Sequence, residues 1–265
     1  MSVFERTEML LGREAVEKLK NCTVAVFGVG GVGGHCAEAL ARSGVGKLVL
    51  IDGDTVAESN LNRQIIASRK TLGMPKTQAA AEHILEIIPE CEVECRQVFV
   101  LPELLESWDF SEFDYVVDAI DTVSAKLTIA KICDKLGIPA ISAMGAGNKL
   151  DPTKFEVTDI YKTSVCPLAS VMRRELRKAG VAKLKVVYSR EPALRPEFQP
   201  SDEDEVLENK ETDTMEENTG KPFRKKTTPA SCAFVPAAAG LIMAGEVIRD
   251  LCAGELARSL ENRGK

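Results

Sequence analysis

VAVFGVGGVGG, residues 24–34, joins a run of small and β-branched residues to a glycine-rich turn. The turn matches the pattern G-x-G-x-x-G, and its glycines are Gly28, Gly30, Gly31 and Gly33. Glycines in such a turn let backbone N–H groups approach a phosphate, and the helix that follows points the positive end of its dipole toward it. The stretch therefore predicts a buried strand, a phosphate site and a helix, but it does not separate ATP from a dinucleotide.

Short β-rich runs and stretches of helical composition alternate around this turn, as they do in α/β proteins. The expected strands are 23–27, 47–52, 93–100, 114–120 and 139–144, and the expected helices between them are 32–43, 75–88 and 122–136. The alternation predicts an α/β fold with a Rossmann-like doubly wound, mostly parallel sheet and helices on both faces.

The texture of the sequence changes after Gly145. Strands are expected at 155–160 and 183–189, a helix between them at 166–179 and a last helix at 234–252, which together form a C-terminal α+β extension. We expect a single domain over residues 1–265, with a nucleotide-binding core over 1–145 and a substrate-side extension over 146–265. Residues 191–230 hold five prolines and the densest run of acids, which predicts a mobile acidic loop.

Polar residues gather where the predicted strands end, at the edge where ligands bind in open α/β sheets. The candidate nucleotide contacts there are Asp52, Asp54, Asn60, Arg63, Gln64 and Lys76. Arg63 and Lys76 can neutralise phosphates during a reaction, and Asp121, after the fourth strand, is placed to hold Mg²⁺. Hydride transfer would leave these three residues without a role. The pattern therefore favours carboxylate activation by ATP over a nicotinamide-dependent oxidoreductase or a nucleotide-binding scaffold without catalysis.

The net charge of −6 is unevenly distributed along the chain. Residues 202–217 carry nine acidic residues and one lysine, a local charge of −8, so the rest of the chain carries +2. That remainder holds two basic runs, one over 173–190 and one over 221–226. Such runs occur on solvated helix faces and on nucleic-acid-binding surfaces alike.

Cysteine usage and hydropathy bound the class of protein further. The eight cysteines form no C-x-x-C pair, which fits a reducing cytoplasm and argues against a four-cysteine zinc site. The first ten residues lack the apolar core of a signal peptide. The longest uncharged run, 227–245, is expected to form a buried helix rather than a membrane span. We therefore expect a cytoplasmic protein with no membrane partner.

Six motifs in register resemble the ubiquitin-activating-enzyme-like superfamily of adenylating proteins, which includes the ThiF, MoeB and HesA types. They cover residues 4–165 and are R-x-x-x-L-x-G from Arg6 to Gly12, G-x-G-G-x-G, D-x-D, S-N-L-N-R-Q, a Pro-Lys helix start and D-A-I-D. The resemblance implies that ATP and magnesium are contacted by Asp52, Asn60, Arg63, Lys76 and Asp121. It also implies a homodimer in which Arg6 enters the neighbouring subunit's site as a catalytic residue.

The second half of the chain resembles the tRNA threonylcarbamoyladenosine dehydratases, chiefly in GAGNKLDPTKFEVTDIYKTSVCPLASVMRRELRK and SCAFVPAAAG. This implies that ATP activates the carboxylate of threonylcarbamoyladenosine in tRNA and that the modification's own side chain then closes a ring with loss of water. On this interpretation the expected tRNA contacts are Arg173, Arg174, Arg177 and Lys178. The alternative is an adenylyltransferase or sulfurtransferase acting on the C-terminal glycine of a ubiquitin-like sulfur carrier, but such members usually carry the zinc cysteines that this chain lacks.

Cys232 precedes the last predicted helix, where the resemblance suggests a loop near the site. Some relatives use such a cysteine, which leaves open a thiol role and a cysteine-desulfurase or sulfur-acceptor partner. Ring closure needs no thiol, and a cysteine is more often a small buried residue than a reactive one. We therefore expect Cys232 to be dispensable for the reaction.

Overall fold

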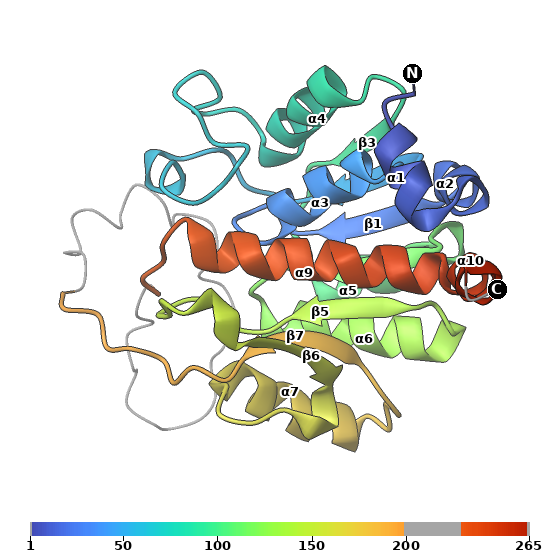
Figure 1. Cartoon of the computed structure of the whole chain (residues 1–265). Helices are drawn as coiled ribbons and strands as arrows, with labels where there is room; N and C mark the ends of the chain where they lie inside the picture. Colours follow the sequence, from blue (N-terminus) through green and yellow to red (C-terminus); the bar gives the residue numbers. More distant parts are fainter. Residues whose placement is uncertain (1, 199–228, 264–265) are drawn as a thin grey trace.

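The computed structural model describes residues 2–198 and 229–263. Seven strands form one sheet in the order β3-β2-β1-β4-β5-β7-β6 (Figure 1). All neighbouring strands are parallel except β6, which runs antiparallel to β7. The strands are β1 (Thr23–Phe27), β2 (Lys47–Ile51), β3 (Glu92–Arg96), β4 (Tyr115–Asp118), β5 (Ala140–Ala143), β6 (Phe155–Asp159) and β7 (Lys185–Ser189). The predicted doubly wound, mostly parallel sheet is confirmed, and the C-terminal strands extend it.

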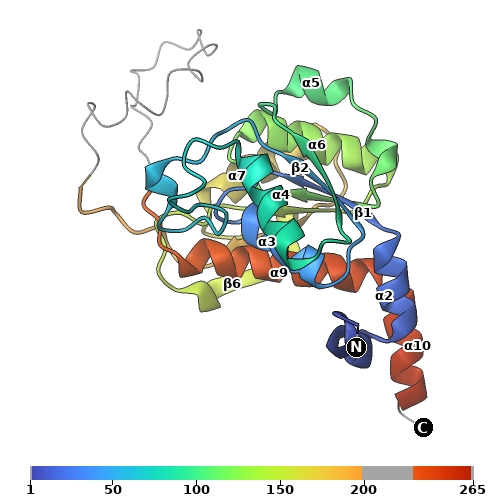
Figure 2. The same cartoon turned by 90° about the horizontal axis from the view of Figure 1, so that it is seen from above.

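Helices cover both faces of this sheet (Figure 2), as the sequence predicts. The helices are α1 (Glu5–Leu11), α2 (Arg13–Lys20), α3 (Gly33–Arg42), α4 (Lys76–Ile87), α5 (Pro102–Glu106), α6 (Val123–Leu136), α7 (Pro167–Lys178), α9 (Phe234–Leu251) and α10 (Ala253–Arg263). The apolar cores assign α2, α3, α4 and α9 to one face and α5, α6 and α7 to the other. The C-terminal helix α9 therefore returns to the N-terminal half of the chain and packs beside α3.

The central strand β1 is buried on both faces, which a parallel strand between two helical layers requires. Val24 and Val26 belong to the core beneath α3 and α9, whereas Ala25 and Phe27 belong to the core beneath α5 and α6. Phe27 stacks on Phe110 with ring centroids 5.8 Å apart. Because both faces of β1 are held in this way, the turn that follows Phe27 starts from a rigid position.

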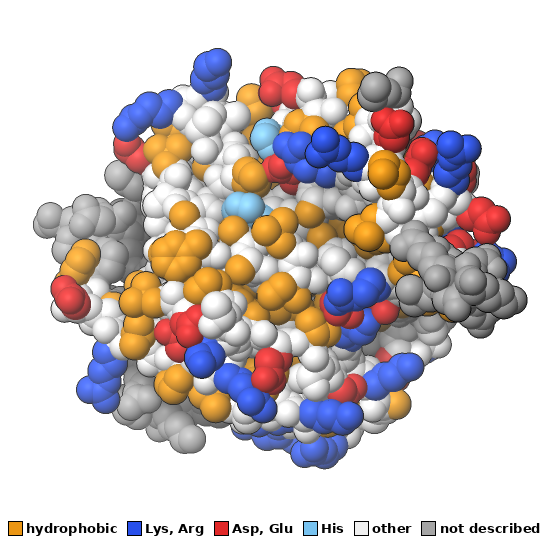
Figure 3. Space-filling view, viewed as in Figure 1, with side chains coloured by type: hydrophobic (Ala, Val, Ile, Leu, Met, Phe, Trp, Pro, Cys, Tyr) orange, Lys and Arg blue, Asp and Glu red, His pale blue; other side chains and the backbone are white. Residues whose placement is uncertain are grey.

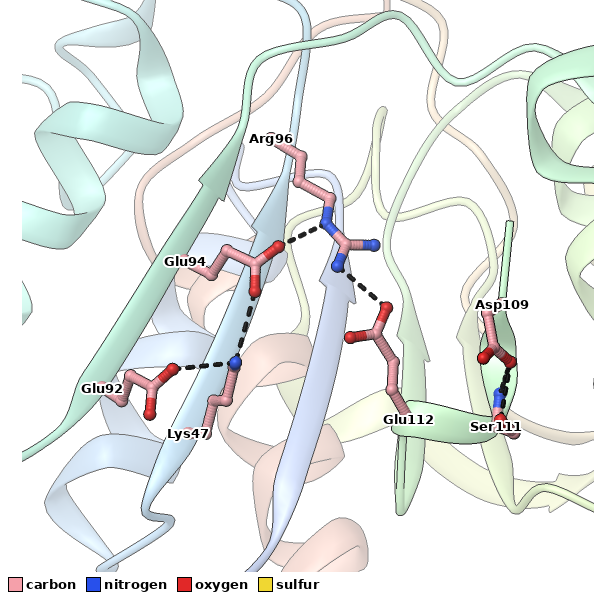
Figure 4. A network of polar contacts seen from close by, with 7 residues as sticks. All are labelled: Lys47, Glu92, Glu94, Arg96, Asp109, Ser111 and Glu112. Carbon is pink, nitrogen blue, oxygen red and sulfur yellow. Dashed lines mark hydrogen bonds and ion pairs between the residues drawn. The ribbon is translucent and has the colours of Figure 1, made fainter. Parts of the chain in front are cut away.

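An ion-pair network fastens the edge strand β3 to its neighbours (Figure 4). The Lys47 ammonium lies 2.8 Å from Glu92 and 3.3 Å from Glu94, across the β2–β3 pair. Arg96 continues the network, at 2.7 Å from Glu94 and 2.8 Å from Glu112, which lies just before β4. Single exposed ion pairs contribute little stability. Here the shared carboxylate of Glu94 connects the pairs, so the network fixes the register of the edge strand.

Two groups of elements differ from the sequence prediction. The strand expected over 93–100 ends at Arg96, because the N–H of Val98 donates to the Arg96 carbonyl and turns the chain. The helices α1, α2, α5 and α10 have no counterpart among the predicted elements. The α1 helix has seven residues and none of them is buried, so its sequence carries no apolar period to reveal it.

The segment predicted as a mobile acidic loop, 191–230, falls mostly outside the described residues. Residues 191–198 form no helix or strand, and residues 199–228, which include the acidic stretch and the second basic run, are not described. In the described part of the chain, no helix combines the length and the apolar character needed to cross a lipid bilayer.

Candidate active site

The glycine turn after β1 has no room for a side chain at two positions. Gly28 has a φ of +82°, and a Cβ there would lie 2.8 Å from the carbonyl oxygen of Ala119. A Cβ at Gly33, the first residue of α3, would lie 1.7 Å from the carbonyl oxygen of Gly28. Only glycine meets both conditions. The backbone of the turn therefore stays bare beside the N-terminus of α3, as a phosphate site requires.

Asp52 follows β2 directly and ties the glycine turn to the next loop. Its Oδ2 accepts a hydrogen bond from the N–H of Val29, and its Oδ1 accepts one from the N–H of Asp54, both at 2.9 Å. Burial raises the pKa of Asp52, and the nearby ammonium of Lys76 opposes that rise. Each carboxylate oxygen keeps a further lone pair, so Asp52 can hold the turn and still accept a ligand hydroxyl.

Lys76 and Asp54 form an ion pair between the β2 loop and the start of α4. The helix begins at Lys76 because Pro75 precedes it, and the Lys76 N–H donates to the Asp54 carbonyl at 2.9 Å. The Lys76 ammonium lies 2.6 Å from Asp54 Oδ2. The Lys76 side chain is 9% exposed and that of Asp54 54%. The cation is therefore held within the protein, whereas its partner stands in solvent.

Two buried amides in the segment SNLNRQ have different roles. Asn60 Oδ1 accepts a hydrogen bond from the Ala57 N–H at 3.1 Å and so shapes the loop itself. Gln64 lies against the glycine turn, with its Nε2 3.7 Å from where a Gly30 Cβ would be. Its Oε1 is buried and finds no hydrogen-bond partner among the described residues. A buried oxygen without a partner is costly, and its position beside the turn is consistent with a ligand that supplies the missing donor.

Arg63 is held by its neighbours at the rim of a small cavity. Its Nη1 donates to the Ser59 carbonyl at 2.8 Å and to Asn62 Oδ1 at 2.9 Å. The Asn62 amide in turn donates to the Ser231 carbonyl, just before α9, at 3.2 Å. The cavity holds about 200 Å³ and is lined by His35, Leu61, Asn62, Arg63, Gln64, Ile65 and Ala233. The segment that leads into α9 therefore completes the site that the first half begins.

A buried polar cluster beneath the loop after β4 escaped the sequence analysis. Lys126 is fully buried, and its Nζ lies 3.0 Å from Asp118 and 3.1 Å from the Ile120 carbonyl. The Ser142 hydroxyl donates to Asp118 Oδ2 at 2.6 Å. The available signal was Asp118, a charged residue at the end of an otherwise apolar strand. The cluster fixes the loop that carries Asp121.

Asp121 itself is exposed and has no hydrogen bond or ion pair to any residue that the structure describes. Its carboxylate is therefore free to take a ligand at the carboxyl edge of the sheet. Arg6, by contrast, lies on α1, at the end of the sheet where the strands begin (Figure 1). The structure does not bring Arg6 to the site of its own chain.

Four basic residues predicted to contact tRNA share one face of α7. Together with Ser170 they line a surface hollow of about 550 Å³, and they are Arg173, Arg174, Arg177 and Lys178. Lys and Arg side chains gather along the lower edge of Figure 3, over α7. Arg173 is the least free, because its Nη1 donates to the Thr163 carbonyl at 3.0 Å. Arg177 lies over the ring of Tyr161 at 5.1 Å.

The cysteines are all free thiols. Burial raises the pKa of Cys22 to about 11 and that of Cys133 to about 12, so neither carries a thiolate at neutral pH. Cys95 is exposed, whereas the cysteines other than Cys95 and Cys232 are buried. Cys232 is half-buried, and its Sγ lies 3.8 Å from the Lys149 carbonyl. Its place beside α9 agrees with the expectation of a position near the site.

This sheet, its bare glycine turn and the ring of charged residues around it define a nucleotide-binding member of the ThiF family. The family profile matches residues 4–262, and the chain belongs to that family. The chain is 45% identical to the tRNA threonylcarbamoyladenosine dehydratase of Bacillus subtilis (strain 168) over 249 residues, which is 94% of each chain. It is 39% identical to the enzyme of the same name from Escherichia coli (strain K12) over 202 residues, covering 73% of this chain and 75% of that one.

A solved structure has the same fold. It is the tRNA N6-threonylcarbamoyladenosine dehydratase of E. coli in complex with ATP, with a TM-score of 0.79 and 31% identity over 95% of this chain and 94% of that one. The same E. coli protein has been solved in complex with AMP, again with a TM-score of 0.79. The resemblance inferred from the motifs is confirmed.

Proposed function

We propose that the protein uses ATP to dehydrate threonylcarbamoyladenosine in tRNA. The observation that carries this proposal is the glycine turn that excludes side chains, surrounded by Arg63, Lys76, Asp121 and the unpartnered oxygen of Gln64. Near-full-length similarity to a protein named tRNA threonylcarbamoyladenosine dehydratase supports the substrate. A tRNA substrate in turn places the reaction in the cytoplasm.

The residues of the site divide the work between binding and activation. The bare backbone of the glycine turn and the N-terminus of α3 hold the phosphates. Arg63 and Lys76 then stabilise the charge that develops as the carboxylate attacks a phosphorus atom of ATP and displaces pyrophosphate or ADP. The modification's own side chain then attacks the activated carbonyl and gives up a proton, and the carboxylate oxygen leaves on AMP or inorganic phosphate. The tRNA therefore loses one water in total. Because that nucleophile is already tethered, ring closure is effectively unimolecular.

Magnesium fits the residues on this edge of the sheet. Mg²⁺ is usually held by one or two carboxylates together with substrate phosphates. Asp121 is an exposed carboxylate without a partner among the described residues, and no group of three metal-binding side chains occurs among them. The three carboxylates Asp52, Asp54 and Asp121 outnumber the two cations of the site, so a triphosphate needs a further positive charge. When bound, Mg²⁺ would neutralise phosphate charge beside Asp121.

We assign nucleotide binding to residues 1–145 and the tRNA side to 146–265, with the basic face of α7 as part of the tRNA surface. Within the described part of the chain, Arg174 and Lys178 pair only with Glu175 on the exposed helix, at 2.6 and 3.1 Å, so both can turn to a phosphate. Reversing the charge of Arg174 and Arg177 should weaken tRNA binding and reduce its salt slope by about 2. Lys20→Glu, on α2, is the control, and equal effects from both changes would refute the surface.

A homodimer would bring Arg6 to a site. Exposed apolar side chains cross the middle of Figure 3 over α9, where Phe234 and Leu241 are 51% and 55% exposed. These two lie seven residues apart, on one side of the helix, and a second copy of the chain would cover them. Mixing an inactive Arg6→Ala protein with an inactive Arg63→Ala protein should then restore about a quarter of the sites, because mixed dimers keep one intact site. No recovery after subunit exchange would refute the shared site.

Mass spectrometry of nucleosides tests the function as a whole. Modified tRNA incubated with the protein, ATP and Mg²⁺ should lose the mass of one water at threonylcarbamoyladenosine. Arg63→Ala should lower kcat by about 10²–10³, and Asp121→Ala should also abolish turnover. Arg69→Ala is the matched control, because Arg69 is 81% exposed and its only ion pair, to Glu58, is long at 3.8 Å. ATP binding without any mass change would favour a carrier-protein substrate instead.

A further inference from the structure

Asn148 joins two segments that are far apart in the sequence. Its N–H donates to the Ala230 carbonyl at 2.7 Å, and its Oδ1 accepts from the Ala230 N–H, also at 2.7 Å. Its carbonyl accepts from the Leu194 N–H at 2.8 Å. Asn148 has a φ of 58°, one of two positive values among the described non-glycine residues. Asparagine tolerates this left-handed conformation better than most residues, which suits it to the position.

The segment that Asn148 holds leads directly to the nucleotide site. Ser231 follows Ala230, and its carbonyl accepts the amide of Asn62 at 3.2 Å. Asn62 Oδ1 then accepts from Arg63 Nη1 at 2.9 Å. The contacts around this segment are tight, since a Cβ at Gly147 would lie 2.7 Å from Pro229. A continuous set of hydrogen bonds therefore runs from Asn148 through residues 230–231 and Asn62 to Arg63.

We infer that Asn148 is a positioning residue that orients Arg63 toward the ATP phosphates by holding residues 230–231 against Asn62. The inference rests on the proposed role of Arg63. The Arg63 side chain lines a cavity, and among the described residues its Nη1 donates to Ser59 and Asn62. Losing Asn62 as an acceptor, or losing the carbonyl that orients Asn62, would leave the guanidinium free to sample other rotamers. The Arg63 side chain then loses more conformational entropy when it binds a phosphate.

Three substitutions separate positioning from a structural role. Asn148→Gly keeps the left-handed backbone but removes the acceptor for the Ala230 N–H. Asn148→Asp keeps both the acceptor and the tolerance for positive φ. Asn62→Ala breaks the same relay nearer to Arg63. We expect Asn148→Gly and Asn62→Ala each to raise the KM for ATP about five- to tenfold, as the loss of one neutral hydrogen bond would, and Asn148→Asp to stay near the parent.

The double variant Asn148→Gly with Asn62→Ala decides whether the two residues act together. If they share one relay, the KM for ATP of the double variant should match that of the single variant with the higher KM, because the effects of residues in one network are not additive. Binding of modified tRNA should change little in all of them. Asn21→Gly is the matched control. Asn21 also makes a side-chain hydrogen bond, to the Glu17 carbonyl at 2.7 Å, but it lies at the C-terminal end of α2. Multiplicative losses, or no rescue by Asn148→Asp, would overturn the inference.

The outcome for Arg63→Ala distinguishes this inference from the proposed function. If Arg63→Ala leaves the affinity for ATP and turnover unchanged, the proposed nucleotide site is wrong. If Arg63→Ala weakens both but Asn148→Gly and Asn62→Ala do not, the site stands and the relay is wrong. The midpoint of urea unfolding, measured on every variant, shows whether a loss of ATP affinity merely follows a loss of stability.

Discussion

Replacing Lys126 with methionine should destabilise the protein more than any exposed ion-pair change. Both side chains of the Lys126–Asp118 pair are almost inaccessible, at 0% and 3% exposure. Methionine fills a similar volume but leaves the Asp118 carboxylate buried without its cation. Removing one partner of a buried pair costs about 3–5 kcal/mol. For a chain of this size each kcal/mol lowers Tm by about 2–4 °C, so the expected fall in Tm is about 6–20 °C.

Urea unfolding followed by circular dichroism measures the loss directly. The double variant Lys126→Met with Asp118→Asn should recover much of the stability, because no unpaired charge remains. Lys20→Met is the control, since the Lys20–Glu17 pair is exposed and should contribute little to stability. Because the Lys126 ammonium also holds the Ile120 carbonyl next to Asp121, Mg²⁺-dependent turnover should fall too. A Lys126→Met protein within about 1 kcal/mol of the parent would refute the reasoning.

Three further predictions concern the turn, Asp52 and Cys232. Gly33→Ala should abolish ATP binding by calorimetry, because its Cβ would overlap the Gly28 carbonyl oxygen, whereas Gly245→Ala, in open space on α9, should stabilise the protein by up to about 1 kcal/mol. Burial raises the pKa of Asp52 above 3.8, so ionising this carboxyl lowers the stability of the folded protein as pH rises toward the raised value. The urea midpoint of Asp52→Asn should therefore gain on that of the parent between pH 4 and pH 8. A constant difference between the two proteins would contradict this. Cys232→Ser should keep full dehydration by mass spectrometry, and loss of turnover would establish a role for the thiol.

Local patterns were enough to predict the frame of the fold. The five β-rich runs of the first half became β1 to β5. For β1, β2, β4 and β5 this is because a parallel strand buried on both faces reads as a nearly continuous apolar run, whereas β3 lies at the edge and is partly exposed. Pro75 correctly marked the start of α4 at Lys76, since proline has no N–H to donate to the carbonyl of a preceding turn and is favoured at the start of a helix. The glycine pattern predicted the turn reliably because the steric constraint that requires glycine involves a few residues close together in the sequence.

The contacts that finish the site depend on tertiary neighbours and left no local pattern. Lys126 lies eight residues from Asp118, and Ser142 lies 24 residues from it, so only the sheet and α6 together reveal the cluster. In the sequence, Asn148 is a single polar residue in a loop, and its hydrogen-bond partner Ala230 lies 82 residues further along the chain. The short helix α5 likewise depends on the packing of its buried Leu105 rather than on a period of its own. Sequence therefore predicts candidate ligand contacts from local motifs, but it does not reveal the residues that hold them in place.

Lys126 and Lys76 are each paired with an aspartate, and the exposure of the aspartate separates their roles. Lys126 and Asp118 are both buried, so neither can leave its partner without leaving a charge in the core. Lys76 is just as confined, but Asp54 has more than half of its side chain in water. Asp54 can therefore exchange its cation for solvent at little cost, while Lys76 stays where a phosphate on the glycine turn would meet it. The same chemical pair fixes a loop in one place and keeps a cation ready for a ligand in the other.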